Sequence, residues 1–162
     1  MSQENPVLEV GTIEREMHVN ATPDVVYEVL SRPEHLREWW PDDAELGPAV
    51  PGTTGEIVFG VRGRPDAVVE QLTVVEAVPP RTFAFRWTHP AGSAPDEGNS
   101  LLVTFRLEPA GTGTRVRMTE TGFREQGWEV ALLEQRYAEH VEGWDWFLPR
   151  LAAYAGSPAA RR

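Results

Sequence analysis

The stretch WEVALLEQRYAEHVEGWDWFLPRLAAY, residues 128–154, is the part of the sequence that decides the fold. Its larger apolar and aromatic residues recur at steps of three and four, which is the spacing of one face of an α-helix. These stripe residues are Leu133, Tyr137, His140, Val141, Trp144, Leu148 and Leu151. We therefore predict one long helix over Trp128–Tyr154 that packs through this stripe and is kinked or loosened at Pro149.

The sequence before this helix is typical of strands. Its β-branched and aromatic residues gather in segments separated by Gly- and Pro-containing turns. The predicted strands are residues 9–19, 56–61, 67–78, 81–89, 100–108 and 114–121, with a possible short one at 44–47. Short connections of this kind join strands into an antiparallel meander. Thr22-Pro23-Asp24 and then Pro33 carry helix-start signals, so two short helices are expected at 22–31 and 33–40.

This order of elements predicts an α+β fold. A curved antiparallel sheet should wrap the long C-terminal helix and leave an apolar pocket between them. The 162 residues suit one domain. We place that domain at residues 9–155, between loose tails at 1–8 and 156–162.

The composition argues against several classes of function. The net charge is −10 and all fifteen basic residues are arginine, without a basic run, so nucleic-acid and anionic-membrane partners are not expected. The absence of cysteine removes thiolate chemistry, disulfides and Cys-type zinc sites. The polar, acidic start and the lack of an apolar stretch of ~20 residues lead us to expect a cytoplasmic protein.

No motif of enzyme chemistry stands out. The four histidines are never spaced as a metal-binding pair, and there is no phosphate loop, dinucleotide fingerprint or nucleophile elbow. We therefore expect no metal, no cofactor and no assignable catalytic residue. A carboxylate acting as general acid or base, such as Glu120, stays open.

Polar residues on the apolar faces are the informative exceptions, because burying them is costly without partners. Period-two alternation places Glu120 beside Met118, and Arg15 beside Met17. For Glu120 and Arg15 three interpretations stand: an ion pair between neighbouring strands, strand ends wet on one side, or polar anchors in a ligand pocket.

Three further polar residues fall on the same faces. His89 follows Trp87 and is either exposed at a strand end or part of the pocket. His140 is either a hydrogen-bonded core histidine or a catalyst, and Tyr137 suits a cavity wall where its hydroxyl stays hydrogen-bonded. The complete candidate pocket lining is Trp40, Phe59, Phe83, Phe85, Trp87, His89, Val103, Phe105, Met118, Glu120, Tyr137, His140 and Trp144.

Several segments together resemble the START-like helix-grip superfamily (SRPBCC domains), in its branch named for activators of the heat-shock protein ninety ATPase, homologue-one-like. The resemblance is carried by Val19-Asn20-Ala21-Thr22-Pro23 with Val26-Tyr27, Trp39-Trp40, Val75 to Phe85 with Pro79-Pro80-Arg81, Gly113-Thr114-Arg115-Val116, and Gly143-Trp144 with Leu148 and Leu151. It covers residues 9–154 nearly completely. It implies a seven-stranded antiparallel sheet gripping the last helix around a cavity. Relatives bind lipids, hormones or polyketides, and a minority are cyclases or hydrolases.

Three hypotheses for the function follow. The first is a binding module for a small, mostly apolar molecule such as a lipid, a polyketide or an aromatic metabolite. The second is a cyclase- or aromatase-like enzyme in which Glu120, His89 or Tyr137 steers protons. The third is a protein-interaction role, chaperone-directed or as a homodimer, through an exposed apolar patch around Trp39, Trp40 and Trp128.

Overall fold

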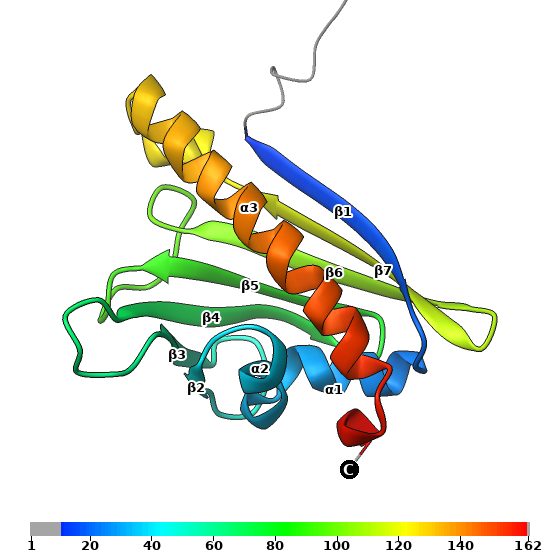
Figure 1. Ribbon diagram of the computed structural model, residues 1–162. Coiled ribbons are helices and arrows are strands. Elements are labelled where there is room, and N and C mark those ends of the chain that lie inside the picture. Colours follow the sequence, from blue (N-terminus) through cyan, green and yellow to red (C-terminus); the bar gives the residue numbers. More distant parts are fainter. Residues whose placement is uncertain (1–10, 162) are drawn as a thin grey trace, which may run out of the picture.

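The computed structural model describes residues 11–161, which form a seven-stranded antiparallel sheet with the strand order β1-β7-β6-β5-β4-β3-β2. The strands are β1 (Thr12–Val19), β2 (Asp43–Glu45), β3 (Thr54–Phe59), β4 (Val68–Val78), β5 (Thr82–His89), β6 (Leu101–Ala110) and β7 (Gly113–Thr121). The sheet is curved, and the long C-terminal helix α3 (Val130–Ala155) crosses its concave side (Figure 1). The predicted helix-grip architecture is therefore confirmed.

Two short helices connect β1 to β2 at one end of the sheet (Figure 1). They are α1 (Pro23–Ser31) and α2 (Pro33–Trp39). Each begins with a proline, whose fixed φ and missing N–H suit the first turn of a helix. Thr22 is the N-cap of α1 by position, although its side chain makes no capping hydrogen bond. Both helices start and end within about a residue of their predicted bounds.

The two halves of α3 differ in how deeply they pack. Its buried residues are Trp144, Leu148, Leu151 and Ala155, all in the C-terminal half. In the N-terminal half the stripe residues Leu133 and Tyr137 are only half-buried. The helix continues through Pro149, which is exposed. The C-terminal half of α3 thus closes the core, whereas the N-terminal half leaves room beneath it.

The two tails predicted on either side of the domain compare differently with the structure. A loose tail was predicted from Gly156 onward, whereas residues Pro158–Arg161 form a short 3-10 helix, η3, whose Ala160 belongs to the buried core. The tail predicted at residues 1–8 lies outside the described residues. None of the helices between residues 11 and 161 is long and apolar enough to cross a membrane.

Candidate functional site

A buried carboxylate lies at the centre of the concave face. Glu120 on β7 is 0% exposed and accepts three hydrogen bonds from ring N–H groups. Trp87 Nε1 donates to Oε2 at 2.7 Å, while Trp144 Nε1 and His140 Nδ1 donate to Oε1 at 2.8 and 2.9 Å. We call these four residues the Glu120 anchor. It joins β5, β7 and α3 through polar contacts in the middle of an aromatic core.

The hydrogen bonds of the anchor indicate the role of Glu120 as an acceptor and the tautomer of His140. All three partners of Glu120 present N–H groups, and an ionised carboxylate, which only accepts, satisfies all of them. We assign the His140 ring from this partner: Nδ1 carries the proton that faces Glu120. In the neutral imidazole Nε2 is then an acceptor. Glu120 therefore orients both the ring and the tautomer of His140.

A pocket of about 300 Å³ opens beside the anchor, between β3–β5 and the middle of α3 from Arg136 to Phe147. It is lined by Trp40, Phe59, Val68, Glu70, Trp87, Arg136, Glu139, His140, Gly143, Trp144 and Phe147. Five of these residues are aromatic. Ring packing continues inward from the pocket: Trp40 stacks on Trp144 with ring centroids 5.4 Å apart and contacts Trp87 at 5.1 Å.

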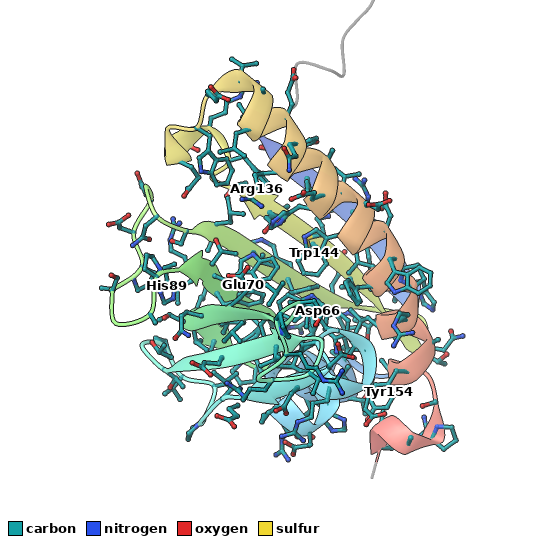
Figure 2. The ribbon with its side chains drawn as sticks, turned by 60° about the vertical axis from the view of Figure 1, so that its left-hand side comes forward. Asp66, Glu70, His89, Arg136, Trp144 and Tyr154 are labelled. Atoms are coloured by element: carbon teal, nitrogen blue, oxygen red, sulfur yellow. The ribbon has the colours of Figure 1, made fainter. Side chains whose placement is uncertain are left out.

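Polar groups gather at one end of this pocket. Arg136 and Trp144 project from α3 toward the sheet, where Glu70 lies on β4 (Figure 2). Burial raises the pKa of Glu70, while the nearby His140 and Arg136 act in the opposite direction and lower it. Arg136 Nη1 also donates to Glu139 Oε1 at 3.4 Å. The pocket therefore combines apolar walls with two carboxyl groups, one guanidinium and one imidazole.

A second, separate groove lies on the other flank of α3. Its volume is about 340 Å³, and its lining is Arg15, Glu16, Met17, Val116, Met118, Trp144, Asp145, Leu148, Pro149 and Ala152. Arg15 on β1 bridges to the helix by donating to both carboxylate oxygens of Asp145, at 2.7 and 3.2 Å. Trp144 lines both spaces, so its indole separates the pocket from the groove.

The structure brings only part of the predicted lining to these two spaces. Trp40, Phe59, Trp87, His140 and Trp144 line the pocket, and Met118 lines the groove. Phe83, Phe85, Val103 and Phe105 are core residues that line neither. Tyr137 donates its hydroxyl to the carbonyl of Thr12 at 3.0 Å, so it ties α3 to β1. Much of the space predicted between sheet and helix is filled by aromatic side chains.

His89 is not brought to the pocket, and the reason is a bulge. Leu72 pairs with Trp87 but Gln71 pairs with His89, so Thr88 is the extra residue, with a left-handed φ of 74°. Simple alternation placed His89 on the face of Trp87. One extra residue instead turns His89 to the other face, where its Nε2 lies 3.0 Å from Thr73 Oγ1. In Figure 2 His89 lies apart from Trp144.

Two further predictions are corrected by the contacts. Glu120 and Arg15 do not form an ion pair between strands: Arg15 pairs with Asp145, and Glu120 binds the three ring N–H groups. Trp39 and Trp40 are buried, so they form no exposed apolar patch. Alternation predicted the faces of Glu120 and Arg15 but not their contact partners, and it did not predict that Trp39 and Trp40 are buried.

Sequence reasoning missed several pocket residues. Glu70, Arg136 and Phe147 were not among the candidates, although Arg136 precedes His140 by one helical turn and Phe147 follows it by two turns. That helical spacing was the available signal. Within residues 11–161, no three His, Asp or Glu side chains are placed to hold a metal ion together.

Comparisons with solved structures show the same fold. A Mesorhizobium loti protein is similar with a TM-score of 0.68 and 24% identity, over 88% of this chain and 95% of that one. The Aha1 dimer of Colwellia psychrerythraea gives 0.61 and 24%, over 87% and 92%. DynU16, a protein of the dynemicin biosynthetic locus, gives 0.64 and 23%, over 89% of this chain and 46% of that one.

The family assignment follows from the sequence itself. No curated protein matches the chain significantly. A family model does match, described as activator of Hsp90 ATPase homolog 1-like protein, and the match spans residues 20–156. This range runs from the start of α1 to the end of α3 and includes every residue that lines the pocket, whereas Arg15, Glu16 and Met17 of the groove precede it. The chain therefore belongs to the family of proteins that are like activator of Hsp90 ATPase homologue 1.

Proposed function

We propose that this protein binds a small, mostly apolar molecule in the pocket between β3–β5 and the middle of α3. The observation that carries the proposal is the composition of that pocket. Aromatic walls from Trp40, Phe59 and Phe147 surround about 300 Å³, and ionisable groups stand at one end only. Small-molecule sites in proteins have this make-up, and their volumes begin at roughly 300 Å³.

The packing of α3 supports the same proposal. The stretch of the helix over the pocket is buried only at Trp144, whereas Leu148, Leu151 and Ala155 beyond the pocket are all buried. Gly143 lies over the pocket, and a Cβ placed on it would meet no atom within 4 Å. An apolar ligand would cover the exposed faces of Phe59 and Phe147, which are half-buried in its absence.

A substitution that fills the pocket tests this proposal. Gly143→Leu adds an apolar side chain into the open space and replaces a poor helix former, so the fold should be retained. Titration with the uncharged fluorescent probe N-phenyl-1-naphthylamine should show binding to the native protein. It should be at least about tenfold weaker for Gly143→Leu, since the ligand would lose most of its buried contact.

The matched control is Ala138→Leu, which puts the same side chain on an exposed position of the same helix. This variant should bind the probe as the native protein does. Equal probe binding by Gly143→Leu and Ala138→Leu would show that the probe binds elsewhere. Background fluorescence with the native protein would contradict the proposal itself.

Acid–base chemistry on the bound molecule is a second candidate function, favoured by the contact between His140 Nδ1 and Glu120. A carboxylate behind an imidazole supports proton abstraction by the other ring nitrogen. With 2-acetylnaphthalene in D₂O, Nε2 would take a methyl proton next to the carbonyl and return a deuteron. Proton NMR should show methyl exchange with the native protein above that with His140→Phe. Equal exchange would exclude this activity for the probe.

Self-association is a separate expectation, supported by the dimer of the Colwellia psychrerythraea relative. On α3, one exposed face carries the apolar side chain of Trp146, which is 65% exposed. Sedimentation velocity of the native protein and of Trp146→Ser would test whether this face joins two copies. A native protein that sediments as a monomer at every concentration would contradict the expectation.

A further inference from the structure

We propose that the pocket selects aromatic molecules that carry an acidic hydroxyl group, and that this hydroxyl hydrogen-bonds to Nε2 of His140. The inference rests on the proposed function, because it concerns what the same pocket binds. It goes further by naming the recognised chemical group and the receiving atom.

The first argument is that Nε2 is the free end of an otherwise fixed ring. Nδ1 is held by Glu120 at 2.9 Å, and the ring packs edge-on against Trp87 and Phe123. Within the described part of the chain no group hydrogen-bonds Nε2, and His140 lines the pocket with 17% of its side chain exposed. A pre-oriented acceptor on a residue that lines a pocket is a recognition group for a ligand O–H or N–H.

The ring N–H and O–H groups near His140 already donate to other protein groups, so they are not available to a ligand. The indole N–H groups of Trp87 and Trp144 both point to Glu120, and the hydroxyl of Tyr137 donates to the carbonyl of Thr12. The two indole rings therefore present carbon surface to the pocket. A flat aromatic ligand suits such walls because aromatic pairs gain from edge and offset contacts beyond their buried area.

Charge decides the kind of polar group on the ligand. Glu139 would repel a carboxylate, and Arg136 would repel an ammonium group. Burial also raises the pKa of Glu70, which favours its neutral form. A neutral hydroxyl avoids both repulsions. An acidic hydroxyl donates a stronger hydrogen bond to Nε2 of His140 than a less acidic one does.

Matched ligands test the hydroxyl separately from the apolar body. 2-Naphthol and 2-methylnaphthalene have nearly the same shape, with a hydroxyl in one and a methyl in the other. By competition with a fluorescent probe, the native protein should bind 2-naphthol about fivefold more tightly, the factor of one net hydrogen bond. 2-Naphthoate and 2-naphthylmethylamine should both bind more weakly than 2-naphthol.

The variant His140→Phe keeps a flat ring and removes the acceptor. It should lose the preference for 2-naphthol over 2-methylnaphthalene, because the hydroxyl would be buried without an acceptor. A preference for 2-naphthol that persists in His140→Phe would overturn the inference. Equal binding of both ligands by the native protein would overturn it too, while leaving the apolar pocket in place. Failure of every naphthalene to bind would contradict the proposed function together with the inference.

A second measurement needs no variant and so does not depend on how His140→Phe folds. In ¹⁵N-labelled native protein, 2-naphthol should shift the Nε2 resonance of His140, and 2-methylnaphthalene should leave it within the shift that ring contact alone produces. Equal shifts with both ligands would overturn the hydroxyl contact.

Discussion

The two flanks of α3 differ in how deeply their polar contacts with the sheet are buried. On each flank a charged residue from the concave face of the sheet reaches a side chain on the helix. Glu120 meets His140 and Trp144 at a depth where its exposure is 0%. Arg15 meets Asp145 at the rim, where the two side chains are 37% and 53% exposed.

This difference in depth assigns the two contacts different roles. At the rim, water screens the charges, and such pairs typically contribute about 0–1 kcal/mol. In the interior each polar group needs a partner, since an unmade hydrogen bond costs roughly 1–3 kcal/mol. The Glu120 anchor should therefore hold the sheet and α3 together, whereas the Arg15–Asp145 bridge should mainly shape the mouth of the groove.

The substitution with the largest expected effect on stability is Glu120→Ala. It would leave the N–H groups of Trp87, His140 and Trp144 without their acceptor and open a small cavity. Removing one partner of a buried charged contact costs about 3–5 kcal/mol, and we expect the free energy of unfolding to fall by about 4 kcal/mol. Urea unfolding followed by circular dichroism measures it.

Glu108→Ala is the control for this experiment. Glu108 lies on the adjacent strand β6, is exposed and pairs with Arg115. Its loss should change stability by less than about 1 kcal/mol. If Glu120→Ala costs no more than Glu108→Ala, water must reach the three ring N–H groups, and the anchor does not hold the fold.

The fold was largely predictable from the sequence because its signals are local. The three- and four-residue spacing of Leu148 and Leu151 with Trp144 marks the helix face that the structure buries. The turns with Gly and Pro separate the strands correctly. The C-terminal segment was less predictable, because Ala160 is buried by contacts with distant parts of the chain rather than by a local pattern.

Trp144→Phe tests the same anchor with a smaller change. Phenylalanine keeps an aromatic ring between pocket and groove but loses the N–H that bonds Glu120 at 2.8 Å. A hydrogen bond to a charged group is worth about 1.5–3 kcal/mol, so we expect a loss of about 2 kcal/mol in the free energy of unfolding. Urea unfolding again measures it.

Trp146→Phe is the matched control, since the same substitution two residues away removes an indole that is 65% exposed. It should be neutral within about 0.5 kcal/mol. Equal losses for the two variants would mean that the bond from Trp144 to Glu120 contributes no stability.

The site was less predictable than the fold, for a physical reason. Alternation along a strand holds only while the backbone stays regular, and the bulge at Thr88 reverses the face of His89. It correctly placed Glu120 and Trp87 on the concave face. It could not show that they are hydrogen-bonded, because a cross-strand distance depends on register and curvature. Glu70 became relevant only when α3 was placed over β4.

Glu70→Gln tests how the polar groups of the pocket make the stability of the protein depend on pH. Burial raises the pKa of Glu70 in the folded state above its ordinary value of 4.5. The folded protein then holds a proton that the unfolded chain has lost, so this group lowers stability as pH rises from near 4.5 through its raised pKa. Glu70→Gln should match the native protein at low pH and become more stable than it above this window.

Urea unfolding of both proteins from pH 4 to pH 8 measures the effect as a difference between two curves. Taking the difference cancels the titrating groups that do not interact with Glu70. A constant difference across the pH range would mean that Glu70 titrates normally in the folded protein, and that the polar end of the pocket is wetter than its burial indicates.

The smallest expected effect belongs to Asp145→Asn at the rim of the groove. It removes the charge that Arg15 contacts at 2.7 Å but keeps the size of the side chain. Exposed pairs of this kind contribute little, so the free energy of unfolding should fall by about 0.5 kcal/mol at low salt. At an ionic strength near 1 M the native protein and the variant should converge, because the screening length shrinks to about 3 Å. Urea unfolding at both salt concentrations measures this.

A loss above about 2 kcal/mol that persists at high salt would mean that the bridge between Arg15 and Asp145 stabilises the fold as much as a buried contact of the Glu120 anchor does. The rim contact would then be a second structural tie between β1 and α3, and exposure would not be what distinguishes the two flanks.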